Sequence, residues 1–151
     1  MQMQNIKKLS FSAVICALAV VAVLAVHFPI FAVAAPFLEY DPGDIFVLVA
    51  GLLLGPWWGL GITLVASLVQ GVTVSAASGL YGILMHIIST GTLVLVATFV
   101  KRLFKSRLSS ELSVACGVLA ATAVMLGANM VITPAFMGVP VEAVRDRKSV
   151  V

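Results

Sequence analysis

Charge is what this sequence has least of. Only 10% of its 151 residues are charged, whereas 62% are hydrophobic. A soluble domain carries about 25% charged residues, and so few cannot cover a water-facing surface. We therefore predict an all-α integral membrane protein. The basic residues form no stripe interleaved with aromatic residues, so we expect no nucleic-acid partner.

Catalytic and metal-binding motifs are also missing. The sequence contains no Walker lysine loop, no HExxH and no GxSxG. Its two cysteines, Cys16 and Cys116, lie inside apolar runs without CxxC spacing, which is typical of small packing residues. We accordingly expect no enzymatic activity, no cofactor and no metal site.

Apolar blocks at 9–35, 45–75, 79–100 and 112–133 make up most of the chain. The first follows Lys7 and Lys8 and resembles a secretory signal. However, its run of about 18 residues exceeds the usual h-region of about 7–15 and approaches the ~20 that span a bilayer. We interpret it as a spanning helix.

The second block contains "GLLLGPWWGLG" at 51–61, where Pro56 removes a backbone donor. Basic residues favour the cytoplasmic side, which places Lys7, Lys8 and the cluster 101–107 inside. Both can lie inside only if block 45–75 crosses twice. We therefore predict five helices, the last four at 44–55, 58–75, 79–100 and 112–133, with the N-terminus cytoplasmic.

Glycines recur every four residues around this predicted turn, at Gly51, Gly55 and Gly59. They would allow close helix contact, although Gly55 and Gly59 could instead form the turn itself. Helix 44–55 would reach only ~18 Å against a ~30 Å hydrocarbon core. Neighbouring helices or a thinner bilayer must accommodate it.

Polar side chains inside the spans are functional candidates because they are costly in lipid. Gln70, His86 and Asn129 fall at similar depths in the outer halves of three helices, and Tyr81 lies near a helix end. They predict a pocket that opens outward beneath the acidic segment 35–44, which would act as a lid. Alternatively, these side chains tie helices together through hydrogen bonds of ~0.6 kcal/mol each.

Three segments resemble one known family. They are "PFLEYDPGDIFVLVAGLLLGPWWG" (36–59), "GLYGILMHIISTGTLVLVA" (79–97) and "NMVITPAFMGVP" (129–140). They are similar to the riboflavin-specific substrate-binding S component of energy-coupling factor (ECF) vitamin transporters. The resemblance implies a six-helix bundle in a bacterial cell membrane. It also implies that the bundle binds a vitamin from outside, with a transmembrane coupling subunit and two cytoplasmic ATPases as partners.

The resemblance also implies residue roles. Phe37, Leu38 and Tyr40 would cover the flat isoalloxazine ring, and Asn129 would bind its polar edge. Asp41 would accept hydrogen bonds from ribityl hydroxyls, or else cap the following helix. With the polar residues above, the predicted substrate-binding residues are Phe37, Leu38, Tyr40, Asp41, Tyr81, His86, Asn129 and Thr133.

Two further features follow from the same resemblance. Ala13 and Ala17 match an AxxxA motif that packs against the coupling subunit, and small residues at that spacing suit close helix approach. Ile83 and His86 depart from the family pattern, where a Glu and an Asn are expected. The departure leaves room for a different ligand.

The C-terminal end also departs from the family. Relatives continue into a sixth helix, whereas this sequence ends in "RDRKSVV". After five spans, Arg145, Arg147 and Lys148 would lie outside, against the charge rule. We therefore expect one transmembrane domain over 1–145, truncated before its sixth helix, and a non-native tail at 146–151.

Two alternatives to a riboflavin S component stay open. One is an S component for another vitamin or a modified-base precursor. The other is a structural subunit of a membrane complex with no ligand of its own. A membrane enzyme is the weakest reading, because no acid–base or metal set is present.

The predicted topology can be tested by labelling. In a variant whose own cysteines are replaced by alanine, Ser106→Cys should resist a membrane-impermeant maleimide in intact cells and react once the membrane is opened. The physical reason is that the basic cluster 101–107 stays on the cytoplasmic side. Labelling of this cysteine in intact cells would show that the cluster 101–107 lies outside and that the topology is the reverse of the predicted one.

Overall fold

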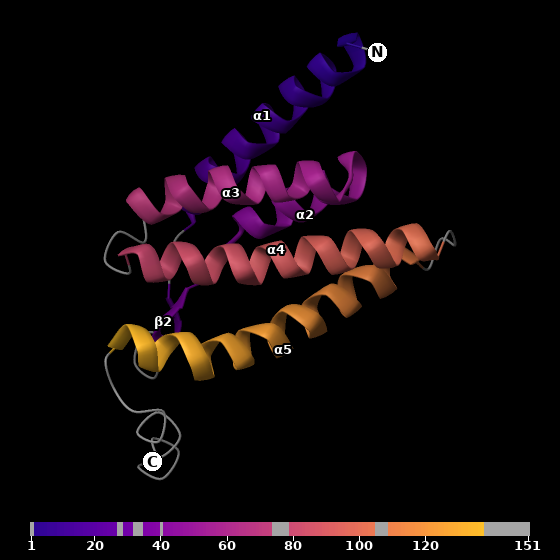
Figure 1. The fold of residues 1–151 in the computed structure, drawn as a ribbon. Helices are drawn as coiled ribbons and strands as arrows, with labels where there is room; N and C mark the ends of the chain where they lie inside the picture. The colour runs from indigo at the N-terminus through magenta and orange to yellow at the C-terminus, as the bar shows by residue number, and fades with distance from the viewer. Residues whose placement is uncertain are drawn as a thin grey trace.

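The chain folds mainly into helices (Figure 1). The computed structural model describes residues 2–26, 29–31, 35–39, 41–73, 79–104 and 109–137. Residues outside these ranges, including the expected tail at 146–151, lie outside the described part. The helices within it are α1 (Gln2–Ala25), α2 (Gly43–Leu54), α3 (Pro56–Val72), α4 (Gly79–Leu103) and α5 (Ser109–Met137). The prediction of an all-α membrane protein with five helices is therefore confirmed.

Three of the described helices are long and apolar enough to cross a membrane. These are α1 over Ile6–Ala25, α4, and α5 over Ser110–Phe136. The helices α2 and α3 are apolar but shorter, with 12 and 17 residues. Large side chains such as Leu119 and Val131 are each 71% exposed on α5. Lipid would cover such side chains in a bilayer.

The helix α4 occupies the middle of the bundle (Figure 1). It packs against α5 on one side and against α2 and α3 on the other, while α1 packs against α2 and α3. Among the described elements, α5 contacts α4 alone. The bundle is therefore a compact group of α1 to α4 with α5 attached to one side.

The block 45–75 forms two helices, as the charge argument predicts. Gly55 joins them with a φ of +111°, a conformation that favours glycine. Pro56 follows at the first position of α3, where its missing N–H costs nothing. The helix therefore begins two residues before the predicted position 58. At the other end, α5 includes Pro134 and runs past the predicted end at residue 133.

Gly51 and Gly59 allow α2, α3 and α4 to approach closely. A Cβ atom at Gly59 would lie 2.5 Å from a methyl of Val94 and 2.9 Å from the Cα atom of Gly51. A Cβ atom at Gly51 would lie 2.6 Å from the same methyl. The predicted close contact therefore exists at Gly51 and Gly59, whereas Gly55 forms the turn.

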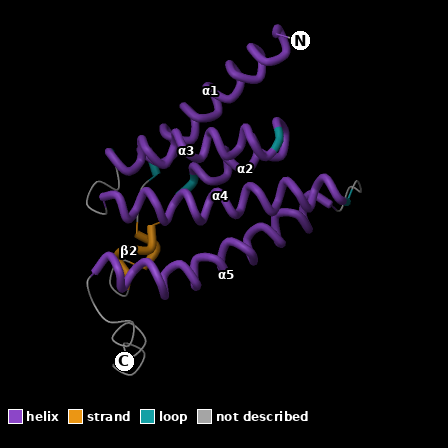
Figure 2. The backbone as a smooth tube through the Cα atoms, in the orientation of Figure 1, coloured by secondary structure: helices purple, strands orange, loops and turns teal. Residues whose placement is uncertain are grey.

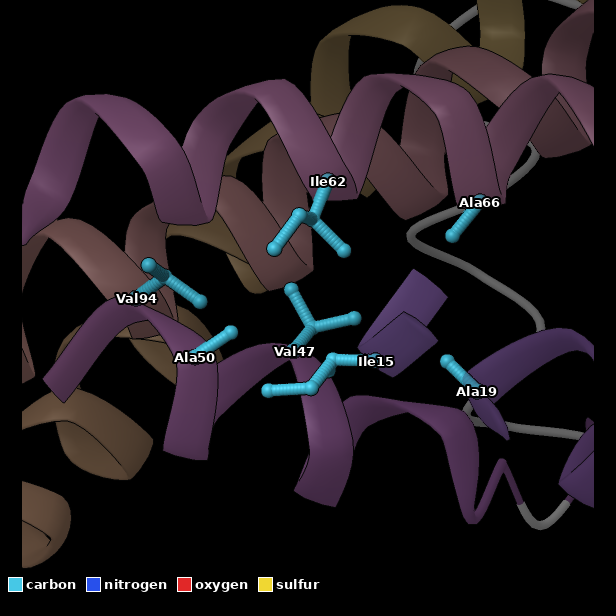
Figure 3. Packing of buried hydrophobic residues seen from close by; sticks show 7 residues of the cluster. All are labelled: Ile15, Ala19, Val47, Ala50, Ile62, Ala66 and Val94. Carbon is cyan, nitrogen blue, oxygen red and sulfur yellow. The ribbon is translucent and has the colours of Figure 1, made fainter. Parts of the chain in front are cut away.

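A small apolar core lies where the first four helices meet (Figure 3). Its residues are small or β-branched for the most part, which suits closely spaced helices. They come from α1 (Ile15, Ala19), α2 (Val47, Ala50), α3 (Ile62, Ala66) and α4 (Val94).

A short antiparallel hairpin joins α1 to α2 and is drawn in orange in Figure 2. The strand β1 (Pro29–Phe31) pairs with β2 (Ala35–Glu39), with Pro29 opposite Glu39 and Phe31 opposite Ala35. The segment 35–44, which we expected to be a lid loop, is thus a strand over its first half. Pairing of the two strands satisfies backbone N–H and C=O groups that would otherwise have to hydrogen-bond to water.

A pair of glycine substitutions on α3 tests the close helix contact. Gly59→Ala should lower the free energy of unfolding by about 1–3 kcal/mol, because the added methyl meets backbone and a packed valine. Gly61→Ala should be neutral or slightly stabilising, since no described atom lies within 4 Å of the position that its Cβ atom would take. Thermal unfolding of both variants in detergent provides the measurement, and equal midpoints would contradict the close packing.

Candidate functional site

The Asp41 carboxylate is the centre of a polar cluster at one end of the bundle. Its Oδ2 atom accepts a hydrogen bond from Nε2 of Gln70 on α3 at 2.9 Å. The same oxygen lies 2.9 Å from Nε2 of His86 on α4. Its Oδ1 atom accepts the backbone N–H of Gly43, the first residue of α2, at 2.8 Å. One side chain thus connects α2, α3 and α4.

His86 has a partner at each ring nitrogen. Its Nδ1 atom lies 2.7 Å from Oγ of Ser67 on α3, and its Nε2 atom faces Asp41. Oδ1 of Asp44 lies 3.6 Å from the same Nε2 and also accepts a hydrogen bond from Oγ1 of Thr90 at 2.7 Å. The arrangement of Ser67, His86 and Asp41 resembles a catalytic triad, but Ser67 is fully buried. We therefore read it as structural.

The charge state of Asp41 follows from these contacts. Burial alone raises the pKa of its carboxyl, but His86, the Gly43 N–H and Gln70 together lower it below its usual value. A lowered pKa in the folded state means that ionised Asp41 stabilises the fold above the pKa of the unfolded chain. That stabilisation is lost as the pH falls through the folded-state pKa.

A second polar cluster lies between α4 and α5. The Tyr81 hydroxyl donates a hydrogen bond to Oδ1 of Asn129 at 3.2 Å. The Tyr81 ring stacks on Phe136, with centroids 4.9 Å apart and planes 27° from parallel. An amide and two aromatic rings therefore sit together near the N-terminus of α4 and the C-terminal half of α5.

The structure divides the predicted site residues into groups. It brings Asp41 and His86 together with Gln70, and Tyr81 together with Asn129. Phe37 and Leu38 belong to β2, and Thr133 belongs to α5. Tyr40 lies outside the described residues. The hydrogen bonds thus place Gln70 and His86 around Asp41, and Asn129 beside Tyr81, whereas the common pocket of Gln70, His86 and Asn129 stays a prediction.

Apart from Gln70, which was predicted only to line the pocket, four residues of these clusters were not among the predicted site residues. They are Asp44, Ser67, Thr90 and Phe136. Helical spacing offers a signal for two of them, because Ser67 lies three residues before Gln70 and Thr90 lies four after His86. Asp44 belongs to the acidic segment 35–44 that was expected to be a lid, whereas Phe136 carried no comparable signal.

An apolar groove of about 580 Å³ lies elsewhere, between α1 and α3. Ala13, Ala17 and Trp58 are among the residues that line it. Ser12 also lines it, is only 6% exposed, and has no hydrogen-bond partner for its Oγ atom among the described residues. The two alanines predicted to contact a partner thus face a groove that is separate from the polar clusters.

Comparison with known protein families gives a match over most of the chain. The family model described as "ECF transporter, substrate-specific component" matches residues 7–149, which is nearly the whole chain. No curated protein matches the chain.

The pKa of Asp41 makes a prediction about acid stability. The temperature at the midpoint of thermal unfolding should decrease as the pH is lowered from 6 to 3, because protonated Asp41 loses its interaction with His86. Asp41→Asn should already be less stable at pH 6 and should vary less with pH. Glu111→Gln, at an exposed residue of the first turn of α5, should keep the wild-type dependence. Parallel curves for the wild type and Asp41→Asn would show that Asp41 carries no such charge.

Proposed function

Because the chain belongs to the family of substrate-specific components of ECF transporters, we propose that it captures riboflavin from outside a bacterial cell. Its partners would be a transmembrane coupling subunit and two cytoplasmic ATPases, whose ATP hydrolysis drives uptake. The chain itself is a transporter component and not an enzyme, in keeping with its family.

The Tyr81–Asn129–Phe136 cluster is the observation that supports a flavin as the ligand. A flavin has a flat aromatic ring with a hydrogen-bonding edge. Stacked aromatic side chains accommodate such a ring, and an amide offers both a donor and an acceptor to its edge. The aromatic residues of segment 36–40 would cover the ring from the side of the hairpin.

The proposed orientation also has structural support. Asp41, Asp44 and His86 gather at the end where α2 begins. Lys101 lies 15 residues further along α4 than His86, which is about 22 Å at 1.5 Å per residue. The guanidinium of Arg102 lies next to Gly55 in the α2–α3 turn. Lys101 and Arg102 thus lie at the end opposite to Asp41, Asp44 and His86, next to the α2–α3 turn, which favours a cytoplasmic position for that turn.

The coupling subunit is proposed to dock on the groove between α1 and α3. Ala13 and Ala17 line this groove, and their small side chains leave room for another helix. The groove shares no lining residue with the polar clusters, so docking and substrate binding would use different surfaces.

A second candidate is an S component for another vitamin. The side chain of Ile83 packs so closely against Gly71 that a Cβ atom there would clash with it, and His86 is engaged with Asp41. The helix α4 therefore lacks the carboxylate and free amide that the riboflavin pattern expects. A different polar ligand could account for this difference.

Riboflavin binding provides the test. The purified protein should be yellow and should quench flavin fluorescence on titration. Asn129→Ala and Tyr81→Phe should each weaken binding by about tenfold, as expected for the loss of one buried hydrogen bond.

The matched control is Thr122→Ala on α5. Its hydroxyl bonds only to the carbonyl of Val118 in its own helix, and it is exposed, so binding should not change. A well-folded protein that quenches no riboflavin but binds another vitamin would favour the second candidate. One that binds no vitamin yet assembles normally with the coupling subunit would favour a structural subunit.

A further inference from the structure

Three metal-ligating side chains from two distant segments meet at the start of α2. Asp41 precedes this helix, Asp44 lies in its first turn, and His86 comes from α4. One ligand atom from each lies within 4.8 Å of the others. The sequence spacing does not predict this set. Asp41 and His86 are 45 positions apart, and the packing of α2 against α4 brings them together.

The distances around the imidazole match those of a coordination sphere. Nε2 of His86 lies 2.9 Å from Oδ2 of Asp41 and 3.6 Å from Oδ1 of Asp44. Two ligands that are each about 2.1 Å from a zinc-like ion lie about 3.0–3.5 Å apart at tetrahedral or octahedral angles. The ligand atoms of the two carboxylates also lie within 4.8 Å of each other.

The charges of the cluster also favour a cation. Two carboxylates contribute a charge of −2, and the described lysine and arginine side chains lie toward the other end of the bundle. Partly buried carboxylates need a nearby positive charge, because the surrounding protein and lipid solvate them poorly. A divalent cation bound to the imidazole and the two carboxylates would balance both charges.

Each of the three ligands is oriented by a residue outside the set. Ser67 contacts Nδ1 of His86, and a ring that donates from Nδ1 to Ser67 leaves the Nε2 lone pair free for a metal. The Gly43 N–H orients Asp41, and the Thr90 hydroxyl orients Asp44. Such outer hydrogen bonds accompany metal ligands in most protein sites.

From these four observations we propose that Asp41, Asp44 and His86 bind one divalent cation of the zinc or manganese type. One imidazole and two carboxylates suit such ions. Calcium prefers six to eight oxygen ligands and should bind more weakly. The cation would join α2 to α4 and hold the segment that leads into α2. This proposal goes beyond riboflavin capture and does not depend on which vitamin is bound.

Metal binding to the full chain tests the proposal. The protein is purified in detergent, stripped with a chelator, and titrated with Zn²⁺ against a chromophoric chelator in the absence of any vitamin. We expect one Zn²⁺ per chain with micromolar or tighter affinity. Asp44→Asn and His86→Gln should each weaken binding at least tenfold.

Matched controls are His27→Gln, which removes the other histidine of the sequence, and Glu111→Gln, which removes an acid of α5. Both should bind Zn²⁺ like the wild type. Zn²⁺ should also raise the unfolding temperature of the wild type and not that of His86→Gln. Less than one Zn²⁺ per wild-type chain at micromolar concentration, or unchanged binding in both ligand variants, would overturn the proposal.

If the variants do not fold, spectroscopy of the zinc-bound wild-type protein still tests which atoms bind the ion. X-ray absorption at the zinc edge should show a shell of nitrogen and oxygen ligands only. A sulfur ligand would place the ion at Cys16 or Cys116 and overturn the assignment. Because riboflavin is absent throughout, failure to bind Zn²⁺ and failure to bind riboflavin are separate results.

Discussion

The Asp41 carboxylate is the group on which one end of the bundle depends. Lipid offers no hydrogen bonds, so polar groups at membrane depth must pair within the protein. Asp41 provides an acceptor for the backbone of α2, for Gln70 on α3 and for His86 on α4. Without it, three helices would each present an unpaired polar group, and each such group costs about 1–3 kcal/mol. Together with the Ser67–His86 and Thr90–Asp44 contacts, this side chain fixes the relative positions of α2, α3 and α4 at this end.

The two polar clusters lie on different faces of α4 and therefore have different surroundings. Tyr81 and His86 are five residues apart, which at 3.6 residues per turn places them well apart around the helix. His86 faces the tightly packed group of α2 and α3, whereas Tyr81 faces α5, which contacts α4 alone among the described elements. A ligand between α4 and α5 would have to part only one pair of described helices. The cluster around His86 is better suited to hold the bundle together.

Much of this fold can be predicted from particular residues. The lysines at 7 and 8 and the basic cluster at 101–107 indicate two helices in block 45–75, and Gly55-Pro56 marks the turn between them. The hairpin could not be predicted from the sequence. Residues 29–31 continue the apolar run of the first helix, so nothing in the pattern indicates that they pair with 35–39 as a strand. The structure shows Gln70, His86 and Asn129 in hydrogen-bonded clusters, as expected for polar side chains inside apolar helices. Depth along a helix does not say which neighbouring helix a side chain faces, so the individual partners could not be predicted.

The helix α3 belongs both to the polar cluster and to the apolar groove. Ser67 and Gln70 point toward His86 and Asp41, while Val65 and Val69 line the groove next to α1. A helix moves as a nearly rigid unit, so a shift of α3 at the polar cluster also displaces one wall of the groove. The groove contains a buried Ser12 hydroxyl without a partner among the described residues, and an acyl chain cannot supply the missing hydrogen bond. A helix with a polar side chain or an accessible carbonyl can do so, which makes this surface better suited to a protein partner than to lipid.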